Sequence, residues 1–168
     1  MKKTTNMRAG FTMVELIFVI VIIGILAAIA MNKMAGTRDD AKVATVVSNA
    51  KTVLQDATTF YTSQGETKYV AAKVSDITSV PLFTDTACST SASSSTFVSG
   101  GPYYICDSVP ADVVVFTPTS AAPYKLNIKQ GASTGAVATM LTSNKAFQAL
   151  TDGPTGKDYN IGGSTLVQ

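Results

Sequence analysis

One carboxylate interrupts the most apolar segment of the chain. Glu15 lies near the start of residues 11–31, where all other side chains are apolar except Thr12 and Gly24. An acidic residue inside a membrane costs about 2.5–3.5 kcal/mol on an insertion scale. We therefore expect the Glu15 carboxylate to interact with another polar or charged group. Two interpretations stay open: an assembly site where it meets a positive charge, or an interfacial side chain that reaches the head groups.

Groups suited to catalysis are scarce. The chain has no His, which excludes His-based triads, His-ligated metals and acid–base chemistry on imidazole. Its two cysteines, Cys88 and Cys106, are too few for a four-thiolate zinc site and do not form a C-x-x-C pair. Neither a P-loop nor a dinucleotide fingerprint occurs. We expect no catalytic residues, no metal site and no enzyme activity.

The net charge of +2 belongs to the amino terminus. Three of the 13 basic side chains, Lys2, Lys3 and Arg8, lie in the first ten residues. The rest of the chain contains ten basic and 11 acidic side chains. The remainder is therefore slightly acidic, and bulk charge implies no direct nucleic-acid partner.

The element that carries Glu15 is predicted to be a helix. Residues 11–31 would form a helix about 31 Å long, the thickness of a bilayer core. The basic residues before it predict a cytoplasmic amino terminus. Helical periodicity then continues on one apolar stripe, made of Val43, Val46, Val47, Ala50, Val53, Leu54, Ala57, Phe60 and Tyr61. One helix over residues 11–63 is the simplest prediction, with an amphipathic second half at 32–63.

The remaining residues, 64–168, predict a β-rich head. Runs at 103–106, 113–117 and 124–128 are β-branched and aromatic, and a last strand is expected within 159–167. One short helix is predicted at 143–150, capped by Ser143 or Asn144. The expected fold is α+β, with a small antiparallel sheet covering the apolar stripe of the long helix.

Three interpretations compete for residues 1–31. A secretory signal peptide would end near Ala28-Ile-Ala30, but Glu15 is costly in its apolar region and the helical pattern continues past the cut. A plain anchor explains the length and leaves the carboxylate unexplained. The third interpretation is a leader followed by a filament stalk.

The third interpretation rests on a resemblance. The residues Ala9-Gly-Phe-Thr-Met-Val-Glu-Leu-Ile17 closely resemble the signature of type IV pilins and pseudopilins, and Ile22-Ile-Gly-Ile-Leu-Ala-Ala-Ile-Ala30 is similar to the stalk of that family. The resemblance covers about the first third of the chain. It implies that a membrane peptidase cleaves between Gly10 and Phe11 and methylates the new terminus at Phe11.

The spacing agrees with this chemistry. Cleavage would free an amine on Phe11, four residues and one helical turn before Glu15. In parallel, axially shifted helices, the amine of one subunit can meet the Glu15 carboxylate of its neighbour. Charges buried among apolar side chains must pair, so this contact would also set the register of assembly.

The resemblance implies a domain plan and a set of partners. The plan is a leader at 1–10, a transmembrane stalk at 11–31, an amphipathic helix at 32–63 and the head at 64–168. The expected function is a structural subunit of a type IV pilus-like filament, held in the inner membrane and polymerised through its first helix. Expected partners are further copies of the chain, the prepilin peptidase, the assembly machinery and membrane lipid. A pseudopilin of type II secretion and a membrane-tethered binding domain remain as alternatives.

One position departs from the family. The family often has a Pro after the apolar run, where this chain has Asn32. Without that Pro, Gly24 is the weakest point of the predicted stalk, by about 1 kcal/mol relative to Ala.

Two further sites are expected in the head. A head outside the cytoplasm lets Cys88 and Cys106 form a disulfide, the alternative being two unpaired thiols. Residues 152–160 gather oxygen ligands in a turn that faintly resembles the calcium loop of major pseudopilins, although the spacing is not an EF-hand. A solvated turn without cofactor is the preferred interpretation there.

Overall fold

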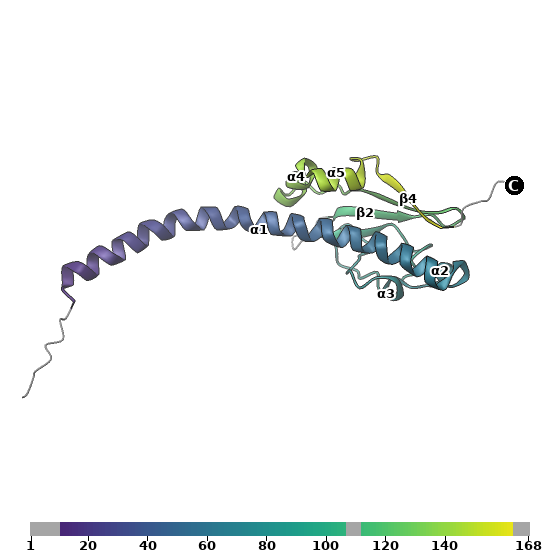
Figure 1. Ribbon diagram of the computed structural model, residues 1–168, viewed down its shortest axis with the longest axis horizontal. Coiled ribbons are helices and arrows are strands. Elements are labelled where there is room, and N and C mark those ends of the chain that lie inside the picture. The colour runs from purple at the N-terminus through teal and green to yellow at the C-terminus, as the bar shows by residue number, and fades with distance from the viewer. Residues whose placement is uncertain (1–10, 107–111, 163–168) are drawn as a thin grey trace, which may run out of the picture. The chain divides into compact units, whose positions relative to one another are not determined.

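The computed structural model describes residues 11–106 and 112–162 and shows an α+β fold (Figure 1). A long amino-terminal helix is followed by short helices and a four-stranded antiparallel sheet. The expected fold class is thereby confirmed. The chain divides into two compact units, Met1–Arg38 and Asp39–Gln168. The leader at 1–10, including Gly10, lies outside the described residues, and the proposed domain boundaries remain predictions.

The first helix, α1, spans Met13–Gln64 as one uninterrupted element. Its sequence has no Pro, so every residue can contribute to the backbone hydrogen-bond ladder. It ends where Gly65 adopts φ 78° and ψ 174°, a conformation available almost only to glycine. The predicted helix at 11–63 therefore differs from α1 by two residues at its start and one at its end.

Within the second unit, α1 contributes one apolar face to the core of the head. The predicted stripe is buried at Val43, Val46, Val47, Ala50, Val53 and Ala57. Leu54, Phe60 and Tyr61 are partly buried against the same core. Asp56 also faces the head, because its carboxylate accepts a 2.7 Å hydrogen bond from the hydroxyl of buried Thr78.

The sheet runs in the order β1 (Tyr103–Cys106), β2 (Asp112–Pro118), β3 (Tyr124–Gln130) and β4 (Lys157–Gly162). All neighbouring pairs are antiparallel. The three predicted central runs are confirmed, and β4 overlaps the predicted last strand but begins two residues earlier. One face of the sheet joins the core that α1 enters, through the alternating residues Tyr103, Ile105, Val114, Phe116, Leu126 and Ile128.

Four short helices complete the head, three of which were not predicted. They are α2 (Glu66–Ala71), α3 (Val74–Ile77), α4 (Ala136–Ser143) and α5 (Lys145–Thr151). The single helix expected at 143–150 corresponds to α5. Asn144 caps it as predicted, since its side-chain oxygen accepts from the Phe147 N–H at 3.0 Å. The same residue ends α4, so Asn144 separates two helices.

Aromatic rings join α1 and α2 to the sheet. Tyr61, Tyr69 and Tyr124 pack together with ring centroids 5.4–6.0 Å apart. Burial raises the pKa of the Tyr69 hydroxyl, and the hydrogen bond that Tyr124 donates to Glu66 raises the pKa of Tyr124. The end of β4 completes the cluster, because Gly162 lies directly against the Tyr61 ring. A side chain at residue 162 has no room.

Replacing Gly162 with Ala should therefore destabilise the head. The new Cβ would overlap the Tyr61 ring, and such overpacking costs about 1–3 kcal/mol. Thermal unfolding of the full chain in detergent, followed by near-ultraviolet circular dichroism, measures the effect. Gly36→Ala is the matched control, because a Cβ there meets no atom within 4 Å. A Gly162→Ala variant as stable as this control would contradict the contact.

Candidate functional site

The segment that carries the predicted assembly chemistry lies at the start of α1. Phe11 precedes the helix and is 81% exposed. Glu15 lies in the first turn of α1 and is also exposed. Because α1 begins at Met13, the expected one-turn spacing from Phe11 to Glu15 is not a spacing along the helix in this structure.

Thr12 explains why the helix begins where it does. Its hydroxyl oxygen accepts a hydrogen bond from the Glu15 N–H at 3.3 Å, and the hydroxyl donates to the Glu15 carboxylate at 3.4 Å. This is the local pattern of a Thr-x-x-Glu helix start, in which a side chain satisfies an otherwise unpaired backbone donor. Sequence reasoning missed Thr12, although that spacing is a known signal. Glu15 thus has a local partner and lies where the helix dipole favours negative charge.

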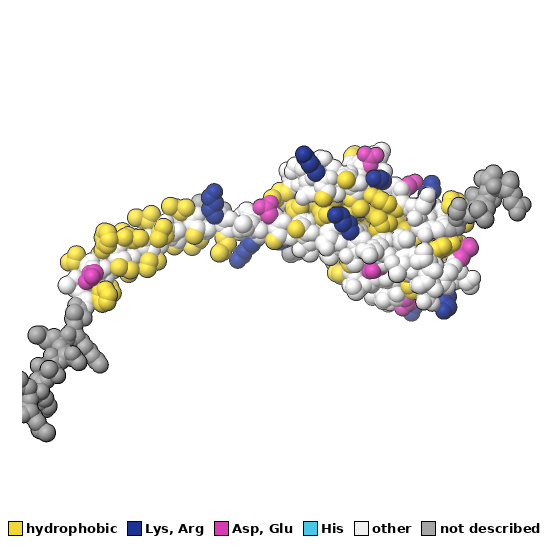
Figure 2. All heavy atoms as spheres, viewed as in Figure 1, with side chains coloured by type: hydrophobic (Ala, Val, Ile, Leu, Met, Phe, Trp, Pro, Cys, Tyr) yellow, Lys and Arg dark blue, Asp and Glu magenta, His cyan; other side chains and the backbone are white. Residues whose placement is uncertain are grey.

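The rest of the first unit presents apolar side chains to its surroundings. Most of the large hydrophobic residues between Phe11 and Met34 are more than half exposed. Figure 2 shows these side chains covering the first part of α1, with few charged groups among them. The helix is long and apolar enough to cross a membrane, and none of its most apolar window is buried by the chain itself. Such a surface needs lipid or other helices around it.

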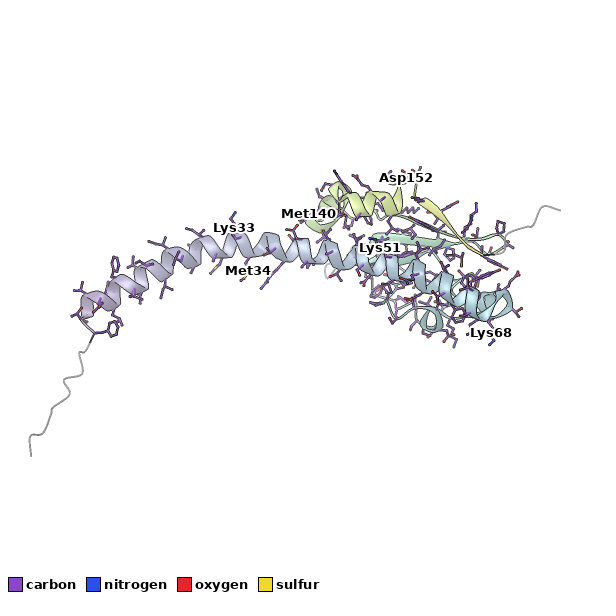
Figure 3. The ribbon with its side chains drawn as sticks, viewed as in Figure 1. Lys33, Met34, Lys51, Lys68, Met140 and Asp152 are labelled. Atoms are coloured by element: carbon purple, nitrogen blue, oxygen red, sulfur yellow. A yellow bond between two sulfur atoms is a disulfide. The ribbon has the colours of Figure 1, made fainter. Side chains whose placement is uncertain are left out.

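Charged side chains follow the apolar run. Lys33 and Met34 lie on α1 just beyond it, and Lys51 lies farther along the same helix (Figure 3). Arg38, Asp39 and Asp40 occupy the positions between. Their mixture of charges is suited to a polar environment.

Comparison with known families matches this segment alone. Residues 5–31 match the family model described as the prokaryotic N-terminal methylation motif. The chain carries a prepilin-type cleavage and methylation motif. Type IV pilins and pseudopilins share this motif, so it supports a pilin-like or pseudopilin protein and marks a structural class of proteins. No curated protein and no solved structure matches the chain.

In the head, Cys88 and Cys106 form a disulfide, with Cα atoms 6.1 Å apart. The bond connects the loop before β1 to the last residue of that strand. Cys88 adopts φ 58°, a left-handed conformation that is uncommon for a residue with a side chain.

Asp85 stabilises the turn that presents Cys88. Its carboxylate accepts from the Ser89 N–H at 3.0 Å, the Thr90 N–H at 2.7 Å and the Ser89 hydroxyl at 3.1 Å. The backbone hydrogen bond from Ser89 is the main reason why the pKa of Asp85 falls to about 2. Sequence reasoning did not identify Asp85.

In the turn at residues 152–160, the carboxylate of Asp158 has partners other than a metal. Asp152 ends α5 with φ 52°, and Asp158 accepts a 2.7 Å hydrogen bond from the Asn127 amide. Lys125 lies 3.9 Å from Asp158. Among the described residues, no group of three or more Cys, Asp or Glu side chains is placed to hold a metal. The preferred interpretation, a solvated turn without cofactor, and its alternative, a calcium site, both stay untested.

The Asp85 turn should respond to acid in a defined pH range. The folded pKa of about 2 lies below the usual value of about 4. The turn's contribution to stability is therefore complete above pH 4 and is lost as the pH falls towards 2. A carbon NMR titration of the Asp85 carboxyl should show a midpoint near 2. The Ser89 and Thr90 amide signals should shift with it, whereas Asp85→Asn should remove this step. A midpoint near 4 would show that the carboxylate does not hold the turn.

Proposed function

We propose that this chain is a structural subunit of a type IV pilus-like filament, with no enzyme activity of its own. One observation carries the proposal: the methylation motif at residues 5–31 includes the start of an unburied apolar helix whose first turn holds Glu15. A tether would need the apolar helix but would gain nothing from a Gly-Phe cleavage signal or from an acidic residue at its start.

In the proposed pathway the chain is inserted in the inner membrane with its amino terminus in the cytoplasm. A prepilin peptidase cuts between Gly10 and Phe11 and methylates the amine of Phe11. Cleavage removes the basic leader, which is the charge that favours cytoplasmic retention of that end. The processed helix then stays in the membrane until the assembly machinery transfers it into a filament that spans the periplasm or leaves the cell.

Glu15 is proposed to guide that transfer. Lipid tails surround the apolar side chains of α1 about as favourably as a neighbouring helix does, so apolar packing alone specifies axial position poorly. An ion pair between the Phe11 amine of one subunit and the Glu15 carboxylate of another has one best register. In the precursor Thr12 holds the carboxylate at 3.4 Å, a long hydrogen bond that an amine can replace.

The pseudopilus of a type II secretion system remains the second candidate, because the matched motif occurs in both machines. Imaging of filaments from the native cell, with mass spectrometry of their subunit, separates the two. If deletion of the gene for this chain abolished protein secretion but left surface filaments intact, the result would favour the pseudopilus.

One prediction of this proposal concerns processing. The mature chain should begin at Phe11 and carry one added methyl group, which intact-mass measurement detects. Gly10→Leu should keep the leader, because a bulky residue at the cut blocks the peptidase. A mature chain that starts at Met31 would instead indicate a secretory signal peptide and contradict the proposal.

Another prediction of this proposal concerns Glu15. Glu15→Val should insert into the membrane normally, since losing a carboxylate makes the segment more apolar. It should nevertheless enter filaments poorly when it is the only subunit present. The Phe11 amine would be buried without its counter-charge, at a cost of several kcal/mol.

The measurement is the yield of sheared filaments relative to subunit in the membrane, at equal expression. Ile20→Val is the control, because it alters the same helix by one methylene and no charge. Wild-type yields from Glu15→Val would leave Glu15 without an assembly role and favour a side chain that only reaches the head groups.

A further inference from the structure

The face of the sheet opposite the core carries a hollow of about 480 Å³. Tyr104, Val115 and Lys129 lie side by side across β1, β2 and β3 on this face, because Val115 is the register partner of both other residues. Their three positions span about 10 Å at the usual strand spacing. Thr86 and Pro102 from the segment before β1, and Pro154 from the loop before β4, also line the hollow.

The floor of this hollow is apolar. Val115 is only 5% exposed although its side chain does not belong to the main core on the other face of the sheet. The Tyr104 side chain is half-buried beside it. Concave sites of several hundred Å³ with an apolar floor and a few polar groups are typical of small-ligand sites.

Lys129 is the cation of the hollow. It is half-buried, and within the described ranges 11–106 and 112–162 no hydrogen bond or ion pair holds its ammonium group. No Asp or Glu is among the described residues that line the hollow. The other lysine on this strand face, Lys125, differs in this respect, because it lies 3.9 Å from Asp158. Lys129 is therefore placed to receive an anion from outside the head.

The polar groups at the rim narrow the class of ligand. Thr117, two residues from Val115 on β2, adds a hydroxyl on the same face of the sheet, and Thr86 also lines the hollow. A polypeptide strand would instead need a free sheet edge for backbone hydrogen bonds. The nearest edge is occupied, because Phe83 and Tyr104 exchange two backbone hydrogen bonds of 2.9 and 3.0 Å.

We propose that this hollow binds a carboxylated sugar ring, such as a uronic acid residue of an acidic polysaccharide. The carboxylate pairs with the Lys129 ammonium group. The C–H face of the ring lies over Val115 and Tyr104, and the ring hydroxyls meet the threonine side chains of the rim. The site lies on the head and uses no part of α1, so it does not depend on the proposed assembly.

The test uses the full chain in detergent micelles, labelled with ¹⁵N and titrated with trigalacturonic acid. Amide signals around Tyr104, Val115 and Lys129 should shift and saturate, while maltotriose, which is neutral, should produce no saturable shift. Lys129→Gln should weaken binding at least tenfold. Lys125→Gln is the matched control and should stay within twofold of wild type.

Three results would overturn the proposal. Equal binding of maltotriose would show that the ligand's carboxylate does not contribute to recognition. Unchanged affinity in Lys129→Gln would show that Lys129 does not bind the ligand. Equal shifts with triglutamate would assign the hollow to acidic peptides. The comparison of ligands on wild-type protein stands even if a variant folds poorly. Failure of this site leaves cleavage and filament yield unaffected, so the two proposals fail separately.

Discussion

The apolar surface on the first part of α1 is the constraint on which the rest of the chain depends. Between Phe11 and Met34 the helix exposes large hydrophobic side chains on all sides, and no part of the described chain covers its most apolar window. Each Å² of such surface costs about 25 cal/mol in water. The segment therefore has to lie in lipid or among other helices, and both environments exclude water. A carboxylate in that setting is expensive unless something pairs with it, which is why Glu15 becomes the informative residue of the segment.

The second part of α1 is buried along one face, whereas the first part is exposed on all sides. From Val43 onward only one stripe is apolar, and the sheet and α4 and α5 bury it in the core of the head. Every core residue thus lies after the first compact unit, which ends at Arg38. Folding of the head draws its hydrophobic stabilisation from residues 43–161, while the segment before them remains available for contacts outside the chain. Substitutions near Glu15 therefore leave the core of the head undisturbed.

The long helix, the strands and the motif were predictable because each has a recognisable pattern in the local sequence. Helical periodicity over residues 43–61 predicted both the length of α1 and its buried face, and runs of β-branched and aromatic residues predicted three of the four strands. The Gly-Phe-Thr-x-x-Glu pattern predicted the motif that the family comparison then matched. These signals depend on sequence neighbours alone, or on one face of one element.

Other features depend on contacts that the sequence does not display. Helices α2 and α3 are too short for a periodic pattern, and tertiary packing around Tyr69 and Val74 holds them. The role of Gly162 needs Tyr61 as its neighbour, about a hundred residues away in the chain. The hollow at Lys129 needs three strands in register. Asp85 acquires its hydrogen bonds and its lowered pKa only when its own turn has formed. Thr12 is the exception, since its spacing to Glu15 was visible and overlooked.

Thr12 gives the Glu15 carboxylate a hydrogen-bond partner within its own chain. A carboxylate waiting for an intermolecular amine would be unpaired until assembly, yet here it already accepts a hydroxyl at 3.4 Å and lies at the positive end of the helix dipole. Both interactions are weaker than a charge-assisted bond to an amine. Under the proposed assembly, they lower the cost of keeping the charged residue in the membrane and leave a net gain when the amine arrives. The local contacts that begin the helix would then hold the carboxylate until a stronger partner replaces them.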